Sequence, residues 1–193
     1  MNTKLFSRRS ALVSVLVIVS VFMNSLLNYL TQLADLPIFM DSMFTVLGTA
    51  LLGPWWGMVI GVSTNLLMDA LQGFSGILWP FAAAQIVTVL VTHIMIRRNA
   101  LKTVLGVTLF ICILAVLNAL AGTVIAVFAF GGFTLKRFDF IVHALIQSGQ
   151  SIFSSAFVTR VVINIVDKGI AVLVLMALFP KLRQYLKPGG EEQ

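Results

Sequence analysis

Charged residues and cysteine are both scarce in this sequence. Charged residues make up 10% of the 193 positions, and Cys112 is the single cysteine. One cysteine inside an apolar run excludes a disulfide framework and a cysteine metal cluster. With 59% hydrophobic residues, the chain carries more apolar surface than a soluble domain of this size can bury.

Signatures of catalysis are also missing. The sequence contains no His-Glu zinc motif, no nucleophile elbow and no glycine-rich phosphate loop. His93 and His143 fall in different predicted segments near opposite membrane faces. We therefore predict that the protein is not an enzyme and needs no metal or other cofactor. Because no ATP-binding motif is present, energised transport would need an ATPase from another chain.

Long apolar runs are what the sequence does contain. They are continuous and lack the period-2 alternation of a transmembrane barrel, so the chain is predicted to be an all-α integral membrane protein. Residues 1–187 are predicted to form a single membrane domain, and 188–193 a disordered tail. Six transmembrane helices are expected, at about 10–30, 39–53, 55–72, 77–97, 102–130 and 161–180.

Basic residues lie between the apolar runs, as topology determinants do, which argues against a nucleic-acid partner despite the net charge of +6. If the N-terminus is inside, most of the Lys and Arg residues are cytoplasmic, and an even number of spans returns the C-terminus to that side. These residues are Lys4, Arg8, Arg9, Arg97, Arg98, Lys102, Lys181, Arg183 and Lys187. Both termini are therefore predicted to be cytoplasmic.

Two connections stand out. The second span is short and turns at Gly53–Pro54, beside two tryptophans that suit a membrane interface. A tight helical hairpin reaching the cytoplasmic face is therefore expected. The longest connection, residues 131–160, is too polar for a lipid-facing helix. It is predicted to form an outer cap with a short helix near Ile141–Gln147.

Polar side chains interrupt the apolar segments at similar depths. Counting about 1.5 Å per residue from the cytoplasmic helix ends places them ~14–29 Å up a hydrocarbon layer about 30 Å thick. Polar groups are costly there, so their cluster predicts an outward-facing cavity for a small solute. The residues are Asn24, Asn28, Asp41, Asn65, Asp69, Gln85 and Asn118. Of these, Gln85 and Asn118 are interpreted as structural.

The third span carries a stripe of five residues, Gly53, Gly57, Gly61, Asn65 and Asp69, which recur every four positions. The glycines predict close approach of another helix, and the two polar residues predict a pocket wall above them. For Asn65, a hydrogen bond to a neighbouring helix is an equally good interpretation. For Asp69, a role in binding is favoured.

Three further polar residues have two interpretations each. Asn24 and Asn28 are four residues apart and either line the pocket or hydrogen-bond between helices. Asp41 either caps the second span or meets a cationic group of the solute. Both interpretations of each residue stay open at this point.

The last span places Asn164, Asp167 and Lys168 on one face, where a structural ion pair is the default interpretation and pocket lining the alternative. Trp79 belongs to an interfacial belt or stacks on a flat solute at the mouth. The predicted substrate-binding set is Asn24, Asn28, Asp41, Asn65, Asp69, Trp79, Asn164 and Asp167.

Two segments resemble a transporter family. LPIFMDSMFTVLGTALLGPWWGMVIGVSTNLLMDAL, from Leu36 to Leu71, resembles the S components of energy-coupling factor (ECF) transporters, and Asn164 to Leu182 resembles their final helix. The resemblance implies six helices with both termini inside, in a bacterial or archaeal cell membrane. It implies a vitamin or similar micronutrient site near the outer face, and a transmembrane coupling protein carrying two ATPase subunits as partner.

The first helix departs from the family pattern. S components often meet the coupling protein through an Ala-x-x-x-Ala surface, whereas this chain has Ser10, Ala11 and Ser14 at the nearest positions. Small residues are partly kept. Docking is therefore expected through these three residues.

Two other functions stay open. A ligand-sensing membrane module of a signalling system would need an effector, and only 13 residues follow Pro180. A small ion-coupled carrier could use Asp41 and Asp69 as coupling carboxylates, but the sequence shows no two halves of matching design. The substrate-capture subunit of an ATP-driven importer is the preferred prediction.

Overall fold

A computed structural model describes residues 3–134 and 136–186, and this part of the chain is helical without strands. The predicted tail at 188–193 lies outside the described residues. The order of elements is α1 (Thr3–Leu33), α2 (Met43–Leu52), α3 (Pro54–Leu71), η1 (Trp79–Phe81), α4 (Ala82–Arg97), η2 (Ala100–Lys102), α5 (Val104–Phe130), α6 (Lys136–Gln147) and α7 (Ile152–Leu186).

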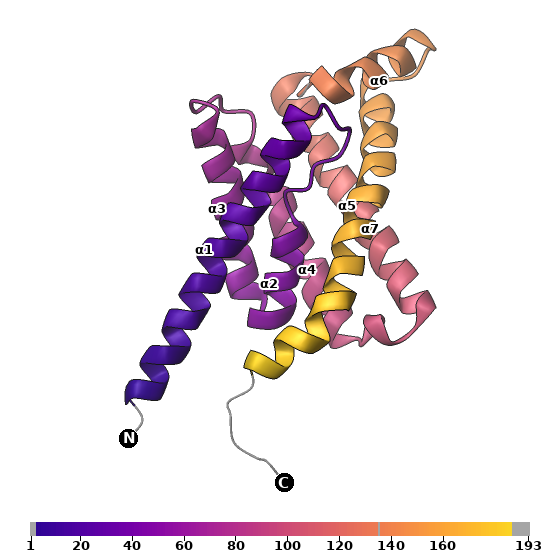
Figure 1. Cartoon of the computed structure of the whole chain (residues 1–193). Helices are drawn as coiled ribbons and strands as arrows, with labels where there is room; N and C mark the ends of the chain where they lie inside the picture. Colours follow the sequence, from indigo (N-terminus) through magenta and orange to yellow (C-terminus); the bar gives the residue numbers. More distant parts are fainter. Residues whose placement is uncertain (1–2, 135, 187–193) are drawn as a thin grey trace.

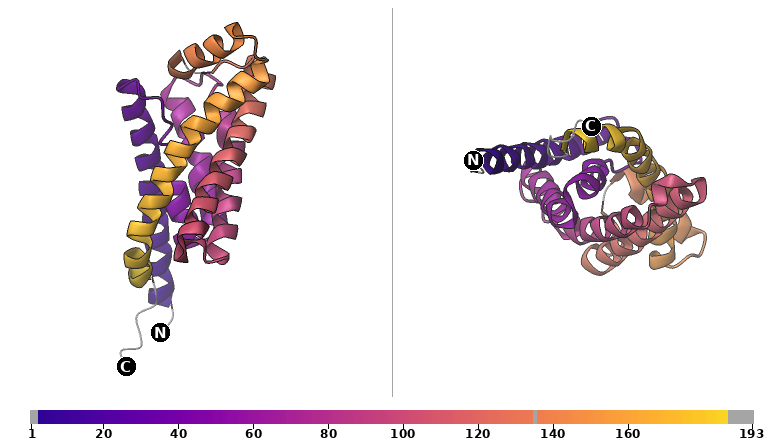
Figure 2. Two further views of the ribbon diagram at one scale, coloured as in Figure 1. Left: turned by 90° about the vertical axis from the view of Figure 1, so that its right-hand side faces the viewer. Right: turned by 90° about the horizontal axis from the view of Figure 1, so that it is seen from below.

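The helices run up and down in a bundle, with α6 lying across one end (Figure 1). We call this the capped end. The first residues of α1 and the last residues of α7 lie at the opposite end, the terminal end (Figures 1 and 2). The short helix α2 packs against α1, α3, α4 and α7, so it occupies the interior of the bundle.

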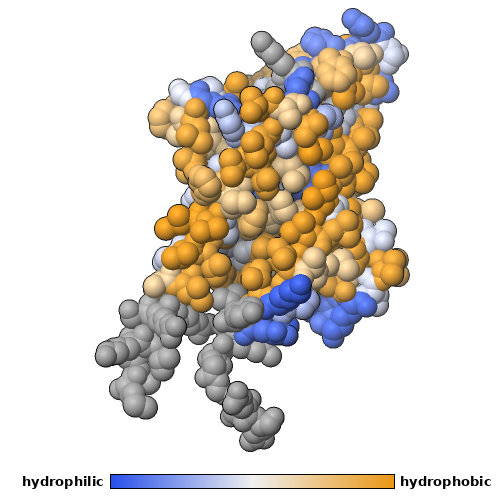
Figure 3. Space-filling model, viewed as in Figure 1, coloured by the Kyte–Doolittle hydropathy of each residue, from blue (hydrophilic) through white to orange (hydrophobic). Residues whose placement is uncertain are grey.

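Four helical stretches are long and apolar enough to cross a membrane: Ser10–Leu33, Trp79–Arg97, Val104–Phe130 and Ile152–Gln184. Large apolar side chains, including Ile18, Phe128 and Val162, lie exposed on the outside of these helices. Apolar side chains cover most of the face drawn in Figure 3, and hydrophilic ones gather towards its two ends. A bilayer is the environment that matches such a surface.

Two predicted spans differ from the observed helices. The expected span 39–53 contains only α2, whose ten residues extend about 15 Å, too short to cross a hydrocarbon layer of about 30 Å. Residues 34–42 reach it from α1 as irregular chain. The last helix begins at Ile152 and not near 161, so the connection before it is shorter than expected. The short capping helix predicted near Ile141–Gln147 is confirmed as α6.

The hairpin between α2 and α3 depends on two glycines with different roles. Gly53 has φ +94° and a Cβ there would meet nothing within 4 Å, so it serves the turn before Pro54 at the first position of α3. At Gly57, a Cβ would stand 2.1 Å from Oγ1 of Thr49 on α2. The predicted close approach of a neighbouring helix is therefore confirmed at Gly57.

The hydrophobic core fills the terminal half of the bundle. Its buried residues come from α2, η2 and the adjoining parts of α4, α5 and α7, and include Phe110, Leu114 and Leu175. Buried asparagines and charged side chains lie between this core and the capped end. The bundle thus has an apolar floor below a polar interior.

We expect Gly57→Ala to destabilise the protein by about 1–3 kcal/mol, because the added methyl group collides with Thr49. The matched control is Gly169→Ala in α7, where the nearest atom to a new Cβ is 4.0 Å away. Thermal unfolding of both variants in the same detergent tests this. Equal melting temperatures for the two variants would contradict the packing argument.

Candidate functional site

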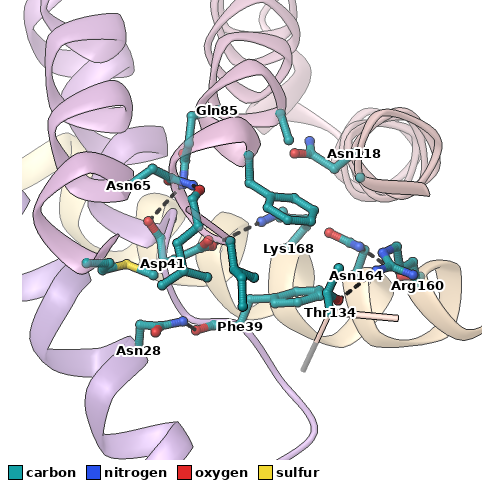
Figure 4. A pocket seen from close by; sticks show the side chains of 16 residues that line it. Asn28, Phe39, Asp41, Asn65, Gln85, Asn118, Thr134, Arg160, Asn164 and Lys168 are labelled. Carbon is teal, nitrogen blue, oxygen red and sulfur yellow. Dashed lines mark hydrogen bonds and ion pairs between the residues drawn. The ribbon is translucent and has the colours of Figure 1, made fainter. Parts of the chain in front are cut away.

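A cavity opens in the capped half of the bundle, above the apolar core (Figure 4). The space open to the centre of a water molecule is about 60 Å³. The lining residues come from α1, α3, η1, α4, α5, α7 and the connections between them: Asn28, Phe39, Asp41, Asn65, Met68, Ile77, Leu78, Phe81, Ala84, Gln85, Asn118, Gly122, Thr134, Arg160, Asn164 and Lys168.

One wall of the cavity is the irregular segment 34–42, which we call the strap. Side chains from three helices hold its backbone: Nδ2 of Asn28 donates to the carbonyl of Phe39 at 2.7 Å, and Nε2 of Gln85 donates to the carbonyl of Asp41 at 3.0 Å. Oδ1 of Asp167 accepts from the backbone N–H of Met40 at 2.6 Å. These bonds replace the helical hydrogen bonds that the strap lacks.

Lys168 forms a buried charge cluster at the strap. Its Nζ lies 2.8 Å from Oδ2 of Asp167 and 4.0 Å from Oδ1 of Asp41, and it also donates to the Ser42 hydroxyl. Lys168 is 3% exposed and Asp167 is 2% exposed, so the desolvated ammonium depends on these carboxylates. The cluster joins α7 to the strap and to the start of α2.

Arg160 precedes Lys168 by eight residues on α7, which is about two helical turns. Its Nη2 donates to Oγ1 of Thr134 at 3.0 Å, and its Nη1 donates to the carbonyl of Ala156 at 3.4 Å. The side chain is 5% exposed and lines the cavity. Arg160, Asn164 and Lys168 recur every four residues, so helical spacing places all three on the cavity side of α7.

Asn24 and Asp167 are buried outside the cavity lining. The Asn24 amide donates to the hydroxyls of Thr45 at 3.1 Å and Thr64 at 3.3 Å, and its oxygen accepts from the backbone N–H of Phe44 at 2.9 Å. It therefore connects α1 with α2 and α3. Asp167 acts on the strap and on Lys168.

Asp69 also lies outside the lining and holds the connection between α3 and η1. Its carboxylate accepts from the backbone N–H of Leu78 at 3.0 Å, the hydroxyl of Ser75 at 3.1 Å and the backbone N–H of Gly76 at 3.3 Å. Ile77 and Leu78 of this connection line the cavity. Asp69 therefore positions part of the cavity wall.

Of the other predicted site residues, Asn28, Asp41, Asn65 and Asn164 line the cavity, and Trp79 lies outside it, 54% exposed. The lining also includes side chains that the sequence interpretation treated as structural or did not single out: Gln85, Asn118, Phe39, Thr134 and Arg160. In the sequence, Arg160 looked like any other of the four basic residues predicted to lie on the outer side, and nothing marked it as a cavity residue. Its spacing of four and eight from Asn164 and Lys168 is the signal that places it.

A family model described as "ECF transporter, substrate-specific component" matches residues 8–179. The chain belongs to this family. No curated protein and no solved structure matches it. The protein is accordingly a multi-pass cell-membrane protein and a substrate-specific component of a transporter.

The N-terminal half of α1 in this S component is less covered by neighbouring helices than the rest of the bundle. Ser10, Ala11 and Ser14 are exposed, and Val17 is the first buried apolar residue among the side chains of α1 that the structure describes, residues 10–33. Figure 1 shows this half of α1 extending away from its neighbours. The three small residues therefore lie on a helix surface that no other described element covers.

We expect Asp69→Ala to weaken binding of the S component's solute by about tenfold or more, because a charged acceptor of several hydrogen bonds is lost. Because Asp69 does not touch the cavity, the loss should come from a loosened connection between α3 and η1. Backbone hydrogen exchange at residues 72–78 should therefore be faster in the same variant. Hydrogen-exchange mass spectrometry with a binding titration measures both. Weaker binding with unchanged exchange would contradict this positioning role.

Proposed function

We propose that this S component is the substrate-capture subunit of an ATP-driven importer for a vitamin or similar small micronutrient. The observation that carries this is the cavity, which polar side chains from five helices line above a closed apolar core. Binding sites for small molecules combine such a shaped hollow with a few convergent polar groups. A chain that belongs to the family and lacks an ATP-binding motif must borrow its energy source.

The topology proposed with this function has six membrane segments and cytoplasmic termini, in a single domain over residues 1–187. The strap and α2 together would make one crossing, since neither is long enough alone. The terminal end carries Arg97, Arg98, Lys102, Lys181 and Arg183, which supports a cytoplasmic position for it. The capped end, with the cavity beneath it, would then face outwards.

The predicted site residues divide into two groups in this proposal. Asn28, Asp41, Asn65 and Asn164 would contact the solute, because they line the cavity. Asn24, Asp69 and Asp167 would shape it through the hydrogen bonds described above, and Trp79 would lie at the rim. A solute larger than the present space would require lining side chains such as Phe39 to move.

The proposed partner is a transmembrane coupling protein that carries two ATPase subunits. The exposed surface at Ser10, Ala11 and Ser14 would dock on it, since small residues let a second helix approach closely. The free half of α1 supplies the length for that contact.

Filling the cavity should abolish binding. Ala84 lines the cavity, whereas its neighbour Ala83 is exposed on the outside of α4. We expect Ala84→Leu to weaken solute binding by about a hundredfold or more, since its added carbons occupy the space the solute needs, and Ala83→Leu to leave it unchanged. Titration of both purified variants, with melting temperatures as a fold control, decides. Equal affinities would place the site elsewhere.

Docking can be separated from binding with Ala11→Trp and Ser14→Trp. Both should leave solute affinity unchanged and reduce ATP-dependent uptake into vesicles containing the coupling complex, because a bulky ring prevents close helix approach. Leu12→Trp, an exposed neighbour on another face of α1, is the matched control. Uptake that proceeds without any coupling complex would favour an ion-coupled carrier, and binding without uptake in its presence would favour a sensor.

A further inference from the structure

Two buried cations line the cavity, and they differ in their partners. Lys168 has the carboxylate of Asp167 at 2.8 Å and that of Asp41 at 4.0 Å. Arg160, equally buried, has no carboxylate within 4.0 Å among the described residues. A buried charge without a carboxylate in contact is costly, so Arg160 is the cation of this cavity that an anion would stabilise most.

The guanidinium of Arg160 also has unused hydrogen-bond capacity. It carries five N–H donors, and its bonds to described residues are those to Thr134 and Ala156. Asp139 of α6 acts on it electrostatically from beyond contact distance, and Oδ1 of Asp139 is bonded to the backbone N–H of Thr134 at 3.0 Å. The planar guanidinium of an arginine that lines a cavity matches the two oxygens of a carboxylate or phosphate.

The opposite wall has the complementary character. Asn65 and Gln85 are 1% and 3% exposed, and their side-chain oxygens accept no hydrogen bond from a described residue. Their amide nitrogens donate to the carbonyls of Leu78 and Asp41, groups that can only accept, so the orientation of both amides is fixed. The unused atoms are therefore acceptors, buried in two side chains that line the cavity, and a solute N–H or O–H would pair with them once the amides turn towards it.

The charges follow the same division. The cluster of Lys168, Asp41 and Asp167 sums to one negative charge, while Arg160 carries one positive charge. Asn65 and Gln85 lie on the side of Asp41 in Figure 4, and Arg160 lies across the cavity from them. The Asp41 side of the cavity thus carries a net negative charge beside the two amide acceptors, while the Arg160 side carries the cationic donors, with Asp139 behind them.

We propose that the solute carries an oxyanion, a carboxylate or phosphate, that binds Arg160, and an N–H-bearing polar end that faces Asn65 and Gln85. This rests on the proposed function, since it names the chemical class of the molecule that the S component captures. Neutral and purely cationic solutes leave Arg160 unmatched. Purely anionic solutes lacking a donor leave both amide oxygens unsatisfied.

The test uses full-length protein purified from native membranes. The compound released on denaturation is identified by mass spectrometry and titrated back onto wild type, Arg160→Gln, Arg160→Lys and the control Arg98→Gln, whose arginine is exposed at the terminal end. We expect a compound with an oxyanion and an N–H group. Arg160→Gln should bind it at least about thirtyfold more weakly, Arg160→Lys should recover part of the loss, and Arg98→Gln should match wild type.

A neutral analogue separates charge recognition from a folding defect. The carboxamide of the compound, or its dephosphorylated form, should bind wild type and Arg160→Gln within about threefold of each other. A released compound without an oxyanion, or equal affinity of Arg160→Gln, overturns this inference but leaves the proposed function intact. If nothing is released, thermal unfolding is measured with β-alanine, which carries a carboxylate and an N–H group, and with its carboxamide, 3-aminopropanamide. Only β-alanine should raise the melting temperature, and equal or absent stabilisation by the two compounds overturns the inference. A wild type that binds no small molecule at all fails the proposed function itself.

Discussion

The packing of the capped half depends on how the backbone N–H and C=O groups of the strap find hydrogen-bond partners. Residues 34–42 enter the bundle as irregular chain, and the backbone polar groups of the inner residues 39–41 need partners inside the protein. Asn28, Gln85 and Asp167 supply them, from α1, α4 and α7. These side chains therefore fix three separate helices to one piece of irregular chain. These three buried polar side chains thus satisfy the backbone of the strap.

The strap also links the charges of the cavity to its cap. Asp41 and Ser42 at its end contact Lys168, and Phe39 packs on Phe138 of α6 with ring centroids 4.9 Å apart. The same short segment thus touches the cation cluster, the cavity and the capping helix. A change in the cavity at Phe39 reaches α6 directly, without passing through the long helices.

Helical periodicity accounts for what the sequence could predict. The hairpin at Gly53, the close packing at Gly57 and the cap helix α6 follow from local spacing and turn chemistry, and all three are observed. Periodicity gives the face of a helix but not the neighbour that the face meets. The loop contacts of Asp69, and the absence of a described carboxylate in contact with Arg160, depend on how segments distant in the chain are arranged. Those required the three-dimensional structure.

The apolar floor has a consequence for the route of a captured molecule. Passage through the terminal half would require α2, α4, α5 and α7 to separate and expose side chains such as Phe110, Leu114 and Leu175. Each fully buried side chain of this kind costs about 1.5–3 kcal/mol to expose to water. An opening at the capped end avoids that cost, and the solute would then both enter and leave the cavity there. Under the proposed function, delivery to the opposite side would then follow the route that the resemblance to ECF transporters implies, in which the whole S component turns over in the bilayer with its cargo enclosed.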